Sequence, residues 1–292
     1  MKTILITGGG RGLGKATAIR LASLGHRVLL TARDDAAGER TVREICAANP
    51  TSRAESLALE LSRLEEVRAF GTRLAAMGLT LDVLLHVAGV MQTHEERQLT
   101  EDGGELTFTV NALAPFLLTS TLWPALQRSA HPRVITVSSR LHLPDSRGRP
   151  VDFDFDDPHL TRGYNPERAY KNSKLAVLWF TRELARRTHG TPLTVNSVCP
   201  GFVPKTAAAS TRGFQHWLMT AVLPHLPFAR SVDEAVDSFT FMALDCSLEH
   251  VSGQFYGEQE VLEPSPEARD DEKARRFWEL AMRETSAAPM PR

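Results

Sequence analysis

Short apolar runs alternate with longer amphipathic stretches along the first 200 residues. The strand-like runs are Thr3–Thr7, Arg27–Thr31, Ala54–Glu60, Leu81–Val87, Arg133–Ser138 and Leu193–Cys199. The stretches with helical periodicity are Gly12–Leu24, Ala36–Ala48, Leu64–Met77, Leu99–Gln127 and Glu167–Thr188. Several of the short runs are almost continuous in Val, Ile and Leu, as in strands buried on both faces of a parallel sheet. The pattern therefore predicts an α/β fold built on a doubly wound parallel sheet.

Two segments interrupt this alternation. Residues 141–166 are rich in Pro, Gly, Arg and Asp and long for a loop, which predicts a surface insertion or a lid. Residues 207–230 are more apolar and partly helical in spacing, which fits a substrate cover, a core helix or a dimer face. No repeat or linker divides the chain. We therefore expect one domain over residues 1–285, ending in a C-terminal extension, and a frayed tail over 286–292.

Charge and composition narrow the range of partners. The 292 residues include 34 Lys and Arg and 35 Asp and Glu, so no overall positive field favours nucleic acid or an anionic membrane. The three cysteines have no CxxC spacing and the histidines are scattered, so we expect neither a disulfide framework nor a metal site. No apolar stretch approaches the roughly 20 residues of a membrane span. A cytoplasmic protein with a small-molecule partner fits best.

A glycine-rich loop joins the first predicted strand to the first predicted helix. Gly8 permits a tight turn, Gly12 lets the backbone approach a pyrophosphate, and Gly14 lets the helix pack close to the sheet. The helix N-terminus that follows offers unpaired N–H groups and the positive end of the helix dipole. The loop predicts an NAD(P)-binding, Rossmann-type domain, with a purely structural turn as the alternative.

The end of the second strand bears on the choice between NAD and NADP. Ala32 stands where NAD-binding proteins usually place an acid, and Arg33 follows it. Arg11, in the glycine loop, can approach the same place, and two guanidinium groups suit a 2′-phosphate. We therefore expect NADP(H). The alternative is that Arg33 is a solvated charge paired with Asp34 or Asp35.

Tyr170 and Lys174 form a candidate proton-transfer pair. They are four residues apart in a predicted helix and so lie on one face of it. An ammonium beside a phenol lowers the pKa of the phenol from about 10, which makes it a usable acid or base near neutral pH. Among the three tyrosines, only Tyr170 has a lysine four residues later.

In combination these motifs resemble the short-chain dehydrogenase/reductase family over roughly residues 1–257. The spacing Thr-Gly-x-x-x-Gly-x-Gly carries the resemblance, together with the following elements. They are the strand that ends at Ser138-Ser139, Val110-Asn111-Ala112, Leu81–Val90, Tyr170–Lys174 and Pro200–Val203. Within the family, the chain looks most like the subgroup of retinol dehydrogenase and WW-domain oxidoreductase relatives. This likeness is carried by Thr31–Asp34, Leu178–Ala185, Val251–Tyr256 and the long gap between Ser139 and Tyr170.

The resemblance implies hydride transfer between NADP(H) and a bulky, partly apolar carbonyl or alcohol. Tyr170 would give or take the proton, and Ser139 (or Ser138) would hydrogen-bond the same oxygen. Lys174 would lower the pKa of Tyr170 and hold the nicotinamide ribose, and Asn111 would fix a water that connects Lys174 to solvent. The implied cofactor contacts are Gly8, Gly10, Arg11, Gly12, Leu13, Gly14, Arg33, Glu60, Leu61, Ala88, Gly89, Tyr170, Lys174, Pro200, Gly201, Val203 and Thr206.

The chain departs from the family pattern at several positions. His86-Val87 replaces paired asparagines, Glu60 stands where many relatives have Asp, and Lys205 takes a usual Thr position, with Thr206 next to it. Two other functions stay open, a catalytically silent NADP(H)-sensing protein and an epimerase or dehydratase. The resemblance also leaves open a homodimer that pairs through Leu99–Gln127 and Glu167–Thr188.

Overall fold

An eight-stranded sheet runs through the molecule in the order β3-β2-β1-β4-β5-β6-β7-β8. The strands are β1 (Thr3–Ile6), β2 (Arg27–Ala32), β3 (Arg53–Ala58), β4 (Val83–His86), β5 (Arg133–Val137), β6 (Thr194–Cys199), β7 (Phe255–Gly257) and β8 (Glu260–Val261). Neighbouring strands are parallel except β7 and β8. The chain runs outward from β1 to β3 and then returns to place β4 on the other side of β1. This reversal confirms the predicted doubly wound α/β fold, and it marks the sheet edge where such folds bind ligands.

The computed structural model describes residues 1–204, 226 and 229–290. Lys205 and Thr206 lie outside the described residues, as does nearly all of the apolar segment 207–230. The interpretations of that segment as a substrate cover, a core helix or a dimer face therefore stay predictions.

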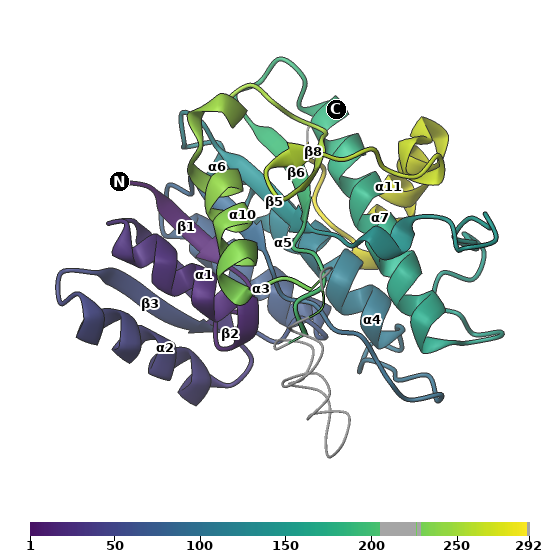
Figure 1. Cartoon of the computed structure of the whole chain (residues 1–292), viewed down its shortest axis with the longest axis horizontal. Coiled ribbons are helices and arrows are strands. Elements are labelled where there is room, and N and C mark those ends of the chain that lie inside the picture. Colours follow the sequence, from purple (N-terminus) through teal and green to yellow (C-terminus); the bar gives the residue numbers. More distant parts are fainter. Residues whose placement is uncertain (205–225, 227–228, 291–292) are drawn as a thin grey trace.

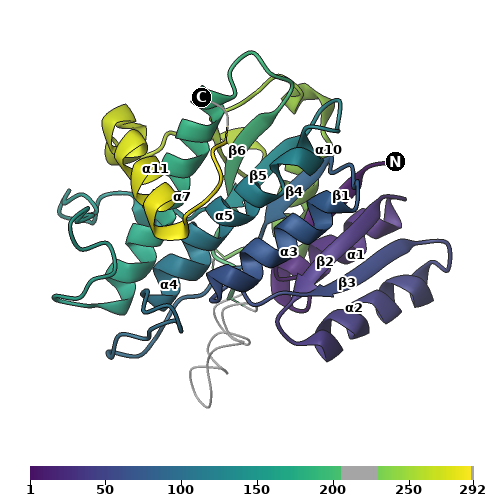
Figure 2. The ribbon, with the colours of Figure 1, turned by 180° about the vertical axis from the view of Figure 1, so that it is seen from behind.

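Helices cover both faces of the sheet, as the two opposite views show (Figure 1, Figure 2). One face carries α1 (Gly12–Ser23), α2 (Asp35–Ala48) and α10 (Val232–Leu244), and the other carries α3 (Leu64–Ala76), α5 (Ala114–Thr121) and α7 (Pro166–Arg187). Alternation along the strands supplies a core to each face. In β1, Ile4 and Ile6 pack with α1 and α10, whereas Leu5 packs with the core that includes α3, α5 and α7.

The predicted helix Leu99–Gln127 is wrong in its start and in its regularity. The helical segment begins with α4 (Leu106–Phe108), passes through a π-helical turn (Thr109–Leu113) and continues as α5 and then α6 (Trp123–Leu126). The Glu105 carboxylate accepts hydrogen bonds from the N–H groups of Thr107 and Phe108 and so starts the helix. Pro115 has no N–H to donate to the carbonyl of Asn111 four residues earlier, which explains the irregular turn.

The C-terminal extension forms α11 (Asp271–Thr285), which packs on α7 and α5. Its Trp278 lies 4.9 Å from the Phe116 ring of α5 and 6.4 Å from the Phe180 ring of α7, measured between ring centroids. Helices α5 and α7 belong to the two segments through which a homodimer was expected to pair, so α11 of the same chain covers part of that surface. Within the tail expected to fray, Ala287 and Met290 are buried, and residues 291–292 lie outside the described residues.

The segment 141–166 is a surface insertion held by aromatic packing. Phe153 and Phe155 lie 5.2 and 5.4 Å from the ring of Trp179 on α7, and the guanidinium of Arg276 on α11 stacks 4.2 Å from Phe155. The insertion is thus anchored on α7 and α11.

Candidate active site

The glycine loop after β1 is shaped to receive an anion. Gly8 and Gly12 adopt φ values of +75° and +57°, which only glycine accepts readily. A Cβ atom on Gly14 would lie 2.3 Å from the carbonyl oxygen of Gly8, so α1 can approach the strand this closely only with glycine there. The N-cap residue Arg11 makes no side-chain capping bond, so the first-turn N–H groups of α1 are available to a phosphate. Gly10 and Leu13 lie on the same loop and helix start. These residues fit the pyrophosphate of a dinucleotide.

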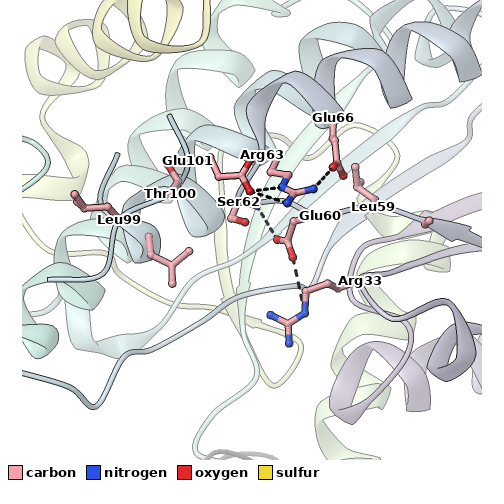
Figure 3. A pocket seen from close by; sticks show the side chains of 11 residues that line it. Arg33, Leu59, Glu60, Ser62, Arg63, Glu66, Leu99, Thr100 and Glu101 are labelled. Atoms are coloured by element: carbon pink, nitrogen blue, oxygen red, sulfur yellow. Dashed lines mark hydrogen bonds and ion pairs between the residues drawn. The ribbon is translucent and has the colours of Figure 1, made fainter. Parts of the chain in front are cut away.

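A pocket of about 530 Å³ opens at the ends of β2 and β3 beside this loop (Figure 3). Its lining residues are Arg33, Ala58, Leu59, Glu60, Ser62, Arg63, Glu66, Leu99, Thr100, Glu101 and Leu106. Leu61 does not line it, because the Leu61 side chain is buried in the hydrophobic core. Figure 3 shows Glu60 between Arg33 and a cluster of Arg63, Glu66 and Glu101.

Ion pairs determine which charges in this pocket are available. Arg33 Nε lies 3.8 Å from Glu60 Oε2, and the Arg33 side chain is 72% exposed. Glu60 Oε1 accepts a hydrogen bond of 2.9 Å from the N–H of Ser62, which holds the carboxylate in place. The Arg63 guanidinium pairs with both Glu66 (2.8 Å) and Glu101 (2.6 Å). Arg33 is therefore the cation in this pocket that can most easily turn toward a ligand, although its partner is Glu60 rather than Asp34 or Asp35.

The ends of β5 and α7 bring the predicted proton-transfer residues together. The hydroxyl of Ser139 lies beside the phenol of Tyr170 and lowers its pKa. The neighbouring Ser138 is buried, and its hydroxyl donates to the carbonyl of Lys174 at 2.9 Å. Lys174 Nζ donates to the carbonyl of Val137 at 2.8 Å and lies 5.5 Å from the centroid of the Tyr170 ring. The geometry therefore favours Ser139 over Ser138 as the partner of Tyr170.

The expected lowering of the Tyr170 pKa is wrong in this structure. Burial raises the pKa of Tyr170 to about 12, and the hydroxyl of Ser139 opposes this increase only in part. Burial also lowers the pKa of Lys174 to about 8, since desolvation disfavours the ammonium. Lys174 lies over the face of the Tyr170 ring and donates a hydrogen bond to the carbonyl of Val137. Its charge therefore does little to lower the pKa of the phenol. At neutral pH the phenol is protonated and able to donate.

Asn111 joins the site through the π-helical turn. Its side-chain amide accepts from the N–H of Val90 and donates to the carbonyl of Val90, both at 2.8 Å, and also donates to the Ser173 hydroxyl at 3.0 Å. Gly89 lies next to the side chains of Asn111 and Lys174. A Cβ atom on it would be 3.3 Å from Asn111 Oδ1 and 3.5 Å from Lys174 Nζ. Both amide hydrogens are thus used, so any water held by Asn111 would have to donate to its backbone carbonyl or to the second lone pair of Oδ1.

The turns after β4 and β6 lie at the same edge of the sheet as the glycine loop. The N–H of Ala88 donates to the Thr7 hydroxyl at 3.1 Å, which ties this turn to the end of β1. After Pro200, Gly201 adopts φ +78°, and a Cβ atom there would lie 2.5 Å from Arg230 Cδ. Val203 is buried. Thr206, the remaining predicted cofactor contact, lies outside the described residues.

His86 replaces an asparagine of the family pattern and is buried at the end of β4. The Thr119 hydroxyl donates to the carbonyl of Pro115, so it can only accept from His86 Nε2, 2.9 Å away. His86 is therefore the neutral Nε2–H tautomer, and its Nδ1 has no hydrogen-bond partner.

We expect this histidine to make the folded protein less stable in acid. Burial lowers the pKa of His86 to about 3 from the usual 6.5. Between these values the unfolded chain binds a proton that the folded protein excludes, so the free energy of unfolding falls as pH falls, by up to about 1.4 kcal/mol per pH unit. Urea denaturation between pH 7 and pH 4.5 measures the slope. The variant His86→Gln should have a shallower slope, and equal slopes for the two proteins would contradict the prediction.

Within ranges 1–204, 226 and 229–290, no three His, Cys, Asp or Glu side chains gather as a metal site. In the same part of the chain, no helix is both long and apolar enough to cross a membrane.

Family models match most of the chain. Residues 2–148 match the model for short chain dehydrogenase, and residues 158–254 match one described as enoyl-(acyl carrier protein) reductase. Human retinol dehydrogenase 13 is 34% identical over 289 residues, which cover 95% of this chain and 82% of the relative. Human retinol dehydrogenase 14 is 36% identical over 296 residues, covering 96% and 85%. Mouse polyprenol dehydrogenase is 35% identical, covering 98% and 84%.

Solved structures share the fold. An uncharacterised protein from Mycobacterium paratuberculosis superposes with a TM-score of 0.77 at 29% identity, covering 99% of this chain and 96% of that one. A protein from Beutenbergia cavernae, described as an NAD(P)-dependent gluconate 5-dehydrogenase with bound NADP, has a TM-score of 0.67 at 29% identity, covering 88% and 94%.

Proposed function

This chain belongs to the short-chain dehydrogenase family, and from that premise we propose that it is an NADP(H)-dependent reductase of bulky, partly apolar ketones or aldehydes. The observation that carries the proposal is the cluster of Ser139, Tyr170 and Lys174, in which Ser139 lies beside the phenol and Lys174 Nζ lies 5.5 Å from the centroid of the Tyr170 ring. This group stands at the same sheet edge as the glycine loop, where a doubly wound sheet places its ligand.

The residues of the cleft fit a dinucleotide. The glycine loop and the start of α1 would hold the pyrophosphate, and the pocket of Arg33 and Glu60 would hold the adenosine end. Gly89 leaves room for the ribose beside Lys174, because a side chain there would approach Lys174 Nζ to 3.5 Å. When bound, NADPH supplies the hydride that reduces the carbonyl carbon.

The side chains supply the proton and stabilise the charge that develops on the carbonyl oxygen. Tyr170 is protonated at neutral pH and gives its proton to this oxygen. Ser139 donates a hydrogen bond to the same oxygen, and Lys174 stands where it would hold the nicotinamide ribose. Protonated Tyr170 suits reduction better than oxidation.

Exposed apolar side chains that follow the central strands support the proposed substrate class. Met91, Leu141 and Phe202 follow β4, β5 and β6, and they are 47%, 41% and 37% exposed. Polar substrates would gain nothing from these side chains, whereas a bulky apolar carbonyl would bury them. The similarity to retinol and polyprenol dehydrogenases supports the same class.

Oxidation of NADPH by a panel of carbonyls, with NADH alongside, tests the proposal. We expect turnover to be highest with NADPH and with large apolar aldehydes or ketones. Binding of NADPH without turnover of any carbonyl would favour the NADP(H)-sensing alternative. Isomerisation or dehydration of a substrate without net consumption of NADPH would favour the epimerase or dehydratase alternative.

We expect Glu60 to weaken the preference for NADP(H), so that Glu60→Gln strengthens it. The carboxylate competes with a 2′-phosphate for Arg33, and exposed ion pairs of this kind are worth roughly 0.2–1 kcal/mol. Affinity for 2′,5′-ADP should therefore rise by about 1.4-fold to fivefold, while affinity for 5′-AMP stays the same, both measured by calorimetry. Glu66→Gln, which removes a partner of Arg63 instead, is the matched control. An equal gain for both ligands would refute the competition.

A further inference from the structure

A buried histidine connects the end of β5 to the C-terminal extension. His142 closes the short 3-10 turn Arg140–His142, which begins directly after Ser139. Its side chain is fully buried, and its ring packs edge-on against Phe255 of β7, with 5.1 Å between centroids. Nδ1 lies 2.5 Å from the carbonyl oxygen of Ser139, and Nε2 lies 3.2 Å from the backbone nitrogen of Ser265. Both nitrogens of the ring are therefore used.

These two contacts allow a single protonation state. The backbone N–H of Ser265 can only donate, so Nε2 must be the unprotonated acceptor. The carbonyl oxygen of Ser139 can only accept, so Nδ1 must carry the hydrogen. His142 is thus a neutral imidazole of the Nδ1–H tautomer, and its burial, which lowers its pKa, favours the neutral form as well.

The Ser265 end of this connection is itself held in place. The Ser265 hydroxyl accepts from the N–H of Ala268 at 3.2 Å, and the Ser265 carbonyl accepts from the N–H of Arg269 at 3.2 Å. One residue before Ala268, the carbonyl of Glu267 accepts from the indole N–H of Trp179 at 2.7 Å. Because Trp179 lies on α7, the segment from Ser265 to Arg269 is joined to the helix that carries Tyr170.

The Ser139 end bears directly on the proposed chemistry. Ser139 is the N-cap of the turn, and its hydroxyl oxygen accepts from the N–H of Leu141 at 3.2 Å. That bond uses a lone pair of the hydroxyl and leaves its hydrogen for Tyr170 or for a substrate oxygen. The turn therefore orients the Ser139 hydroxyl, and His142 holds the Ser139 carbonyl within the same turn.

We propose that His142 is a positioning residue for the reaction, which orients Ser139 by joining its carbonyl to the backbone of Ser265. The proposal rests on the proposed function, since the orientation of Ser139 matters only if its hydroxyl serves the reacting oxygen. His142 touches neither Tyr170 nor Lys174 in any contact that the structure records, and it acts through Ser139.

A pair of isosteric variants separates the two contacts of the ring. The amide of Asn reaches about as far as Nδ1, and the amide of Gln reaches about as far as Nε2. We expect His142→Asn to keep turnover within about threefold of the parent while its melting temperature falls, because only the contact with Ser265 is lost. We expect His142→Gln to keep the melting temperature and to lose turnover by about tenfold or more, at an unchanged KM for NADPH. His131→Gln, an exposed histidine, is the control.

The outcomes distinguish this inference from the proposed function. If the parent protein binds NADPH but reduces no carbonyl of the panel, the proposed function fails first. If the parent is active and turnover in both variants falls only in step with the melting temperature, His142 is merely structural and the inference is overturned. A measurement on the unaltered protein needs no variant to fold: the nitrogen NMR spectrum of His142 should report the Nδ1–H tautomer, and an Nε2–H tautomer would overturn the inference.

Discussion

Tyr170→Phe should lower the turnover of carbonyl reduction by roughly two to four orders of magnitude, the range of general acid catalysis. The variant removes the phenolic hydrogen that Tyr170 would give to the carbonyl oxygen, and it leaves the ring under Lys174 Nζ, 5.5 Å away. The glycine loop and the pocket of Arg33 and Glu60 are untouched. Binding of NADPH, measured by quenching of protein fluorescence, should therefore stay within about threefold of the parent.

The matched control for this variant is Tyr256→Phe. Tyr256 lies on β7 and packs in the core on the α1 and α10 face, away from the candidate site. It should lose the same hydroxyl group without a comparable change in turnover. Unchanged turnover in Tyr170→Phe would remove Tyr170 from the proton transfer and, with it, the main support of the proposed mechanism.

Trp278→Ala should cost about 3–5 kcal/mol in the free energy of unfolding, the usual loss when a buried aromatic side chain is truncated. Trp278 is 4% exposed and lies against Phe116 and Phe180, with the Arg187 guanidinium 4.4 Å from its ring centroid. Truncation leaves a cavity at the place where α11 joins α5 and α7. Equilibrium denaturation in urea measures the loss.

Two further variants make this result specific to the packing of the indole. Trp278→Phe keeps a ring against Phe116 and should lose much less stability. Glu279→Ala changes the exposed neighbour on α11 and should be nearly neutral. A loss below about 1 kcal/mol for Trp278→Ala would mean that α11 adds little to the stability of the fold.

Much of the fold and of the candidate site is readable from the chain because the signals are local. Apolar runs such as Ile4-Leu5-Ile6 mark the central strands, since both faces of a doubly wound sheet are buried. The Tyr170–Lys174 spacing and the glycines after β1 depend on the geometry of one helix and one turn. The short edge strands β7 and β8 give weak signals, because two or three residues show no period. The π-helical turn did have a local signal, namely Pro115 four residues after Asn111.

The sequence by itself determined the class of fold, the glycine-rich loop after β1 and the placement of Tyr170 and Lys174 on one face of a helix, because each depends on neighbours along one element. Only the tertiary structure decided that Ser139 faces Tyr170, that Glu60 lies against Arg33, and that His142 reaches Ser265. It also reversed the expected pKa shift of Tyr170. The physical reason is common to these cases. Contacts between distant segments and the loss of water around a buried group arise from packing, and no spacing along the chain records them.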